Sequence, residues 1–170
     1  CPLIPTDDTA EEGSRYRTGD PCLWKGAAGY FALTGSKQGR HLVDCVPAPH
    51  LWFSEDLRDW TYRGMFLEND VFTSAGEDCA VPYFWPFGDR HILIFGSHQR
   101  GPQYLLGDWD EEAGKFRPVA HDRFCFGPIN HGGANAPTAT PDGEGGVYLF
   151  HMMSHGLETN GWNGIMTLPT

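Results

Sequence analysis

Acidic side chains stand just before two proline-containing runs of the chain, and this placement suggests chemistry. Asp20 directly precedes Pro21, and Glu77 and Asp78 come shortly before Val81-Pro82. Before Pro137 the third such run offers Asn130, His131 and Asn135 instead. Carboxylates that converge from separate segments can cleave a glycosidic bond, because one protonated acid donates to the leaving oxygen while another carboxylate attacks or stabilises the oxocarbenium-like centre. The same positions also suit Asp residues that merely cap turns beside strands, so both interpretations stay open.

Other side chains near these runs could bind the sugar that such a site would take. Trp24 and Trp85 each follow a proline by three residues, and we predict that their rings stack on a neutral sugar, with His98 and Asn130 as polar contacts. Ser97-His98 is a weak candidate for a nucleophile pair, because adjacent strand residues point to opposite faces. The histidines lack the spacing of a metal-ligand set, and we expect neither a metal nor a cofactor.

The elements that must position these side chains form an internal repeat. In two copies, which begin at Pro21 and Pro82, a Trp stands three residues after the Pro and a Gly-Ser pair stands fourteen and fifteen residues after it. A third, more degenerate copy begins at Pro137 and has Thr140 in place of the Trp. In each copy two apolar runs flank a Gly- or Asp-containing turn, which predicts antiparallel strands.

The spacing of the copies predicts the architecture. The three prolines are separated by 61 and then 55 residues, and four short strands in each interval are typical of propeller blades. We therefore predict that residues 1–170 form an all-β, partial β-propeller domain with repeat units starting near residues 20, 81 and 136. A β-sandwich with chance Pro-x-x-Trp matches is the alternative.

The composition agrees with this fold class and excludes several partners. The 170 residues include 22 Gly and 13 Pro, which disfavours long helices, and 40% hydrophobic with only 20% charged residues excludes a disordered tail. A formal charge of −10 repels nucleic acid and anionic membrane surfaces, so we expect neither as a partner. Apolar runs such as Val147–Phe150 are far shorter than the roughly 20 residues that span a bilayer. The five cysteines form no C-x-x-C pair and are expected to be free thiols.

Two segments resemble those of a known glycosidase family. The run Glu77–Gly88 is similar to that family's acid-Cys-Pro-Asp-Phe-Phe-Pro-Leu segment, and Gly161–Pro169 is similar to its Gly-Trp-x-Gly-x-Met-Thr-Leu-Pro-Arg segment. On these residues the chain, from about Tyr16 to Thr170, resembles glycoside hydrolase family 32, the invertase, levanase and β-fructosidase group. The resemblance implies a five-bladed β-propeller, with about three four-stranded blades in this chain. It also implies hydrolysis of β-fructofuranosyl or related furanosyl linkages by a retaining two-carboxylate mechanism without a cofactor.

The resemblance places one catalytic role on Asp20. This residue stands where an Arg-Asp-Pro motif has the aspartate that stabilises the transition state, with Gly19 in place of the arginine. The family's nucleophile belongs to an Asn-Asp-Pro-Asn-Gly-like motif that nothing in residues 1–16 matches, since Asp7-Asp8 lacks the following proline. A retaining mechanism needs its two carboxyl groups within about 5–5.5 Å. We therefore expect the nucleophile to lie outside this chain and this fragment alone to be inactive.

The general acid/base has two candidates. The family's glutamate immediately precedes Cys-Pro, a spacing that falls on Ala80 when Pro82 is aligned. Glu77 has the required side chain, whereas Asp78 has the required neighbour, Cys79. Asp78 also keeps the strand parity relative to the proline, while Glu77 would need a bulge to face the same way. Both residues remain predictions for this role.

Two other functions stay open at this level. A non-catalytic carbohydrate-binding propeller would account for the missing arginine beside Asp20. A sialidase-like propeller is suggested by Ser54–Trp60, which partly resembles an Asp-box but lacks its glycine. The expected partner is a small-molecule or oligosaccharide substrate. Polysaccharides are met outside the cytoplasm, which favours export of the parent protein.

Overall fold

The chain is built from β-strands. A computed structural model describes residues 18–36, 49–74, 77–126, 133–159 and 162–169, and every regular element in these ranges is a strand. The predicted all-β class is therefore confirmed. Among these residues there is no helix with the length and apolar character needed to cross a membrane.

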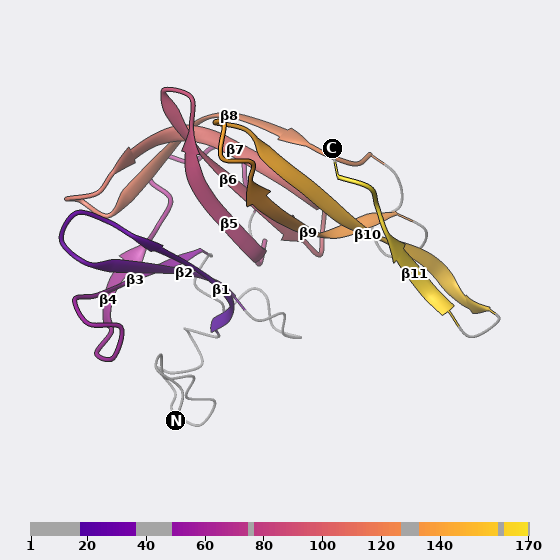
Figure 1. Cartoon of the computed structure of the whole chain (residues 1–170), viewed down its shortest axis with the longest axis horizontal. Coiled ribbons are helices and arrows are strands. Elements are labelled where there is room, and N and C mark those ends of the chain that lie inside the picture. Colours follow the sequence, from indigo (N-terminus) through magenta and orange to yellow (C-terminus); the bar gives the residue numbers. More distant parts are fainter. Residues whose placement is uncertain (1–17, 37–48, 75–76, 127–132, 160–161, 170) are drawn as a thin grey trace.

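Eleven strands form three antiparallel sheets, which we call A, B and C (Figure 1). Sheet A contains β1 (Thr18–Lys25), β2 (Tyr30–Ser36), β3 (His50–Ser54) and β4 (Thr61–Met65). Sheet B contains β5 (Ala80–Phe87), β6 (Arg90–Ser97), β7 (Gly101–Asp110) and β8 (Lys115–Arg123). Sheet C contains β9 (Ala134–Pro141), β10 (Val147–Thr159) and β11 (Trp162–Met166). In each sheet the strand order follows the chain, so every sheet is a meander whose first strand lies at one edge.

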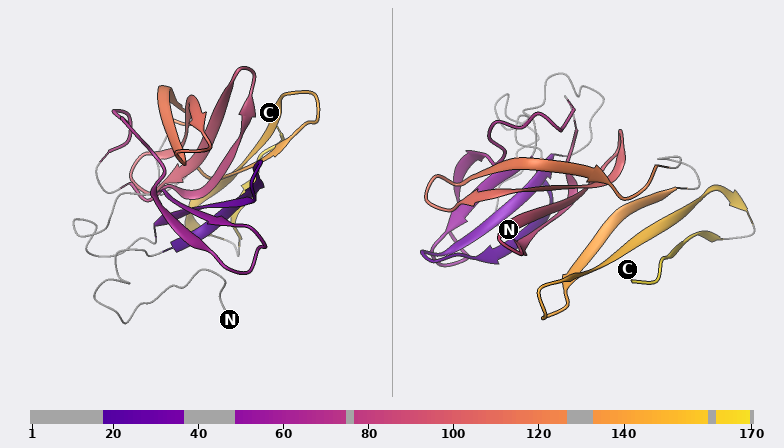
Figure 2. Two further views of the ribbon diagram at one scale, coloured as in Figure 1. Left: turned by 90° about the vertical axis from the view of Figure 1, so that its left-hand side faces the viewer. Right: turned by 90° about the horizontal axis from the view of Figure 1, so that it is seen from above.

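Sheet B lies between the other two, with β5 in contact with β1 on one side and with β9 on the other (Figures 1 and 2). This position explains the continuous apolar run Ile92–Phe95 in β6, because a strand covered on both faces has no solvent side to make polar. The first strands of consecutive sheets thus lie next to one another, as the innermost strands of propeller blades do.

Two clusters of apolar side chains hold the sheets together. The cluster between sheets A and B is aromatic: the Trp24 ring lies 5.5 Å from Phe31, 5.0 Å from Phe84 and 5.9 Å from Trp109. The cluster between sheets B and C contains Ile92, Ile94, Ala139 and Leu149. Burying rings of this size supplies much of the energy of the core.

The repeated Gly-Ser pair allows close contact between neighbouring sheets. A Cβ added to Gly35 in β2 would lie 2.3 Å from the carbonyl oxygen of Cys79, in the segment that leads into β5. A Cβ added to Gly96 in β6 would lie 3.3 Å from Cδ of Pro137 in β9. In both copies the glycine of a second strand therefore faces the entry to the next sheet, where a larger residue has little or no room.

The repeated proline marks a backbone irregularity shared by all three sheets. The residue before it has a positive φ each time, 43° at Asp20, 45° at Val81 and 42° at Ala136. At each of these points the ladder shifts register by one residue, which is a β-bulge. Proline donates no hydrogen bond to a ladder, and non-glycine residues rarely adopt positive φ. The repeat seen in the sequence is thus a repeated bulge, a device that often re-aims side chains beside functional sites.

Candidate functional site

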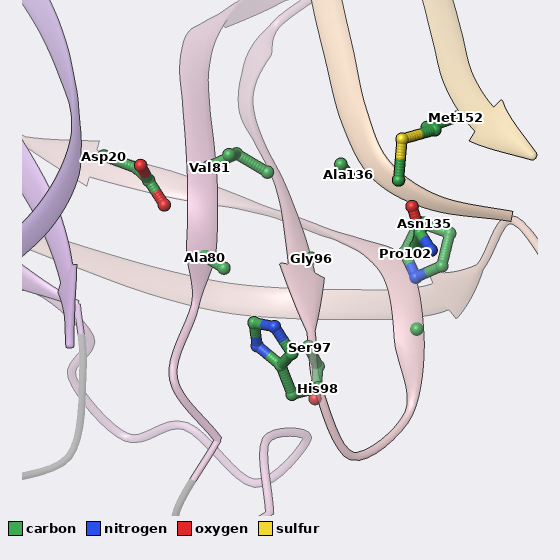
Figure 3. A pocket seen from close by; sticks show the side chains of 11 residues that line it. Asp20, Ala80, Val81, Gly96, Ser97, His98, Pro102, Asn135, Ala136 and Met152 are labelled. Atoms are coloured by element: carbon green, nitrogen blue, oxygen red, sulfur yellow. The ribbon is translucent and has the colours of Figure 1, made fainter. Parts of the chain in front are cut away.

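The bulges meet at a pocket of about 260 Å³ (Figure 3). Its walls come from the entries of β1, β5 and β9, the end of β6, the start of β7 and the middle of β10. The lining residues are Asp20, Ala80, Val81, Gly96, Ser97, His98, Gly101, Pro102, Asn135, Ala136 and Met152. The residue before each repeated proline is among them. The volume lies just below the range of about 300–1,000 Å³ usual for small-molecule pockets, so it suits one ring-sized group.

Few polar side chains face this pocket, and they come from different sheets. Asp20 in sheet A is exposed, and among the described residues none donates a hydrogen bond to its carboxylate. Asn135 in sheet C has a buried Oδ1 that finds no partner within the described part of the chain. Much of the remaining lining is apolar, as in most ligand sites, where a few convergent polar groups set orientation.

His98 is a further polar group on the pocket, and Asp78 holds it from behind. Nδ1 of His98 lies 2.5 Å from Oδ2 of Asp78, and the His98 main-chain N–H donates to Oδ1 over 3.2 Å. The Asp78 side chain is only 3% exposed, whereas that of His98 is 50% exposed. Ala80 of β5 pairs with Gly96 of β6, Asp78 lies two residues before Ala80, and His98 lies two residues after Gly96. Because the strands are antiparallel, the register itself places Asp78 and His98 opposite each other.

Glu77 does not line the pocket, and a set of hydrogen-bond donors holds its carboxylate. Arg100 donates from Nε to Oε1 over 2.9 Å and from Nη2 to Oε2 over 2.7 Å. Gln103 and the main-chain N–H of Ser74 each donate over 2.6 Å. Burial opposes ionisation of Glu77, but the bonds from Arg100, Ser74 and Gln103 together outweigh it, so the pKa of Glu77 lies below its ordinary value. Such a carboxylate is a poor proton donor near neutral pH.

The predicted site residues are thus only partly brought together. Asp20 and His98 line the pocket, and Asp78 lies directly behind His98. Asn130 lies outside the described residues. The bulge at Val81 falls between Asp78 and Pro82, so alternation counted back from the proline does not decide which way Asp78 faces.

The two tryptophans differ from their predicted role as sugar platforms. Trp24 packs among Phe31, Phe66, Phe84 and Trp109 between sheets A and B. Trp85 stacks on Tyr83 at 5.3 Å and packs against the cluster between sheets B and C. Neither lines the pocket. The physical reason is that positions three residues after the proline face the neighbouring sheet, where a large ring fills the gap between blades.

One feature of the site follows from the sequence and another does not. Asn135, two residues before Pro137, stands at the entry of the third repeat, and this position predicts it as a polar group of the shared site, where it does line the pocket. The pairing of Asp78 with His98 depends on the one-residue register shift, for which a Val-Pro dipeptide is only a weak sign. Within the described ranges, no group of three or more His, Cys, Asp and Glu side chains is arranged to hold a metal ion.

The stacked sheets, the repeated bulges and the pocket at the strand entries define part of a β-propeller with a site on its inner strands. No family model matches the sequence, and no curated protein matches it.

Solved structures of glycosidases resemble the chain. The Bombyx mori β-fructofuranosidase of glycoside hydrolase family 32 superposes with a TM-score of 0.68 at 19% identity, over 97% of this chain and 36% of its own. The sucrose-6-phosphate hydrolase from Lactobacillus gasseri gives 0.60 at 18% identity, over 90% of this chain and 34% of its own. The endo-arabinase from Bacteroides thetaiotaomicron gives 0.54 at 20% identity, over 83% and 47%.

At these identities the likeness shows the fold alone, which is that of the propeller glycosidases. The chain spans about a third of the length of the first two enzymes.

Proposed function

We propose that the pocket is the sugar site of a glycosidase, and that the whole protein hydrolyses β-fructofuranosyl or related furanosyl linkages by a retaining mechanism. The observation that carries the proposal is the position of Asp20. Its carboxylate accepts no hydrogen bond from the described residues and lies on a small pocket beside His98 and Asn135, which come from other sheets. A carboxylate in this position stabilises the positive charge that develops on the sugar ring as the glycosidic bond breaks.

The remaining roles follow from burial and contact. Of the two acidic candidates, Asp78 is the one that serves the acid side of the reaction, which it does through its contact with His98 on the pocket, and we give Glu77 a structural role in its ion pair with Arg100. The nucleophilic carboxylate belongs, on this proposal, to a part of the protein outside residues 1–170.

The resembling structures are consistent with a furanosyl substrate. A variant of the Bombyx mori enzyme has been solved with sucrose, and the β-fructofuranosidase from Schwanniomyces occidentalis with fructosyl-erythritol. A pocket that fits one ring-sized group also suits removal of single terminal sugars better than cleavage inside a long chain.

The test is hydrolysis of sucrose, inulin and levan by the full-length protein, with Asp20→Asn as the variant. We expect the wild type to release fructose with retained anomeric configuration by NMR, and the variant to lose about 10²–10³-fold in kcat, the usual effect of removing one transition-state contact. Asp89→Asn, in the exposed β5–β6 turn, is the matched control and should leave kcat unchanged. Equal activity of wild type and Asp20→Asn would overturn the role of Asp20.

One observation favours a second candidate, a propeller that binds carbohydrate without cleaving it. Ala80 occupies the position of the family's acid/base glutamate by motif spacing, and it lines the pocket. Binding of sucrose or fructans by calorimetry, weakened by Asp20→Asn and with no turnover by the wild type, would support this candidate over the glycosidase.

A further inference from the structure

We propose that His98, held in place by Asp78, is the proton donor of this site. The inference rests on the proposed glycosidase function and adds to it a group that the resemblance does not supply. It assigns to Asp78 a positioning role and to the imidazole the direct contact with the leaving oxygen.

Of Asp78 and His98, only His98 is accessible from the pocket. Asp78 is 3% exposed, and both its oxygens face His98, one toward the ring and one toward the main-chain N–H. It therefore cannot reach a sugar in the pocket without giving up these bonds. The His98 ring is half exposed and lines the pocket (Figure 3), so it is the part of this pair that a substrate can touch.

The His98 ring is held in the orientation that a proton donor needs. With Nδ1 bound to the Asp78 carboxylate, the tautomer and orientation of the imidazole are fixed, and Nε2 remains to exchange a proton with a ligand. Among the described residues Nε2 has no hydrogen-bond partner. A buried carboxylate behind a His also offsets the positive charge of the imidazolium form, which is the form that donates.

Among the described residues of the pocket wall, no other side chain is placed to donate the proton. Ala80, at the motif position of the acid, has only a methyl group, and it lies across β5–β6 from Gly96, two residues before His98. Glu77 is bound by Arg100 and Gln103. Asp20 is the other titratable group of the pocket, and β9 contributes the neutral Asn135.

Nε2–H of the imidazolium gives its proton to the glycosidic oxygen while the bond from that oxygen to the anomeric carbon breaks, and the bond pair stays on the oxygen of the departing alcohol. The nucleophilic carboxylate of the proposed mechanism forms a covalent bond to the anomeric carbon. His98, now neutral, then removes a proton from the water whose oxygen displaces that carboxylate, which restores the imidazolium.

The experiment compares substrates whose leaving groups differ in their need for a proton. In the full-length protein, His98→Gln should lower kcat on sucrose by about 10²–10⁴-fold, the usual contribution of general acid catalysis. On 4-nitrophenyl β-fructofuranoside, the rate of bond breaking in this variant should fall by only a few-fold, because nitrophenolate departs without needing a proton. His91→Gln, which removes a half-buried histidine that stacks on Phe84 away from the pocket, is the control.

Asp78→Asn tests the positioning role separately. We expect kcat on sucrose to fall less than it does in His98→Gln. As in that variant, the fall should be larger on sucrose than on 4-nitrophenyl β-fructofuranoside. Nitrogen-15 NMR of the histidine side chains should show that the hydrogen-bonded Nδ1–H signal of His98 disappears in this variant and persists in His91→Gln. An unchanged signal would overturn the positioning role, whatever the activity.

The outcomes distinguish the two proposals. A wild type that cleaves neither substrate overturns the glycosidase and, with it, the proton donor. If the wild type is active, two results for His98→Gln, shown to be folded by circular dichroism, overturn only the role of His98. One is an equal loss of turnover on both substrates, and the other is sucrose turnover within about threefold of the wild type.

Discussion

Replacing Glu77 by Gln tests whether this carboxylate serves structure or catalysis. The change removes the charge that faces Arg100 and puts an amide NH₂ against one of the donors that now bind Oε1 and Oε2. Breaking a fully buried pair costs about 3–5 kcal/mol. Because the Arg100 side chain is 28% exposed and the Glu77 side chain 3%, water partly compensates the arginine. We therefore expect the free energy of unfolding to fall by about 2–4 kcal/mol.

The assay is urea denaturation followed by tryptophan fluorescence in the full-length protein, with Glu68→Gln as the matched control. Glu68 also pairs with an arginine, Arg117, at 2.5 Å, but the two side chains are 37% and 41% exposed. Exposed pairs of this kind contribute about 0–1 kcal/mol. The same chemical change should therefore have a clearly smaller effect at this position.

The effect of Glu77→Gln should depend on pH with a defined sign. Since the pKa of Glu77 is lowered from 4.5 in the folded protein, its contribution is fully present above that value and is lost as the pH falls through the folded pKa. The difference in unfolding free energy from the wild type should be largest at pH 7 and shrink below about pH 4.5.

Two results would refute the reasoning about Glu77. A loss of stability no larger than that of Glu68→Gln would mean that the buried network contributes little. A folded Glu77→Gln protein that loses more than about 100-fold in turnover would mean that Glu77, rather than the Asp78–His98 pair, serves the reaction.

Three further predictions concern packing, the pocket and a thiol. Gly35→Ala should destabilise by about 1–3 kcal/mol in thermal melts, because its Cβ would meet the Cys79 carbonyl, whereas Gly19→Ala, with nothing within 4 Å, should not. Asn135→Leu should weaken sucrose binding about tenfold by calorimetry without loss of stability, since the buried Oδ1 has no partner to lose among the described residues. Burial and then the Asp78 charge raise the pKa of Cys79, so iodoacetamide at pH 8 should label it only after unfolding, as mass spectrometry would show.

The fold was largely predictable because its signals are local. Short apolar runs between Gly, Pro and Asp turns predict strands wherever they fold, and the repeated Pro-x-x-Trp and Gly-Ser offsets predict repeated units. The third sheet departs from the expected four strands, with three in the described residues. The repeat was a good guide because each sheet needs the same bulge and the same close contact with its neighbour.

The site was less predictable because its contacts join residues from different strands and sheets. Asp20 was identified as a pocket residue from its place before a proline, and the same rule applied to the third repeat points to Asn135. From the sequence, Trp24 and Trp85 are equally compatible with a ring that stacks on a sugar and with a ring buried in the core. Only the packing between sheets shows that they are core residues.

The sequence by itself determined the strands, the repeat and the set of acidic residues near the entries of the inner strands, because these depend on residue type and on spacing along the chain. Tertiary structure alone decided which of these residues face the pocket. The bulge at Val81 shifts the β5–β6 register by one residue, and this shift puts Asp78 opposite His98. A period of two along a strand cannot foresee such a shift, because a single extra residue reverses every position beyond it.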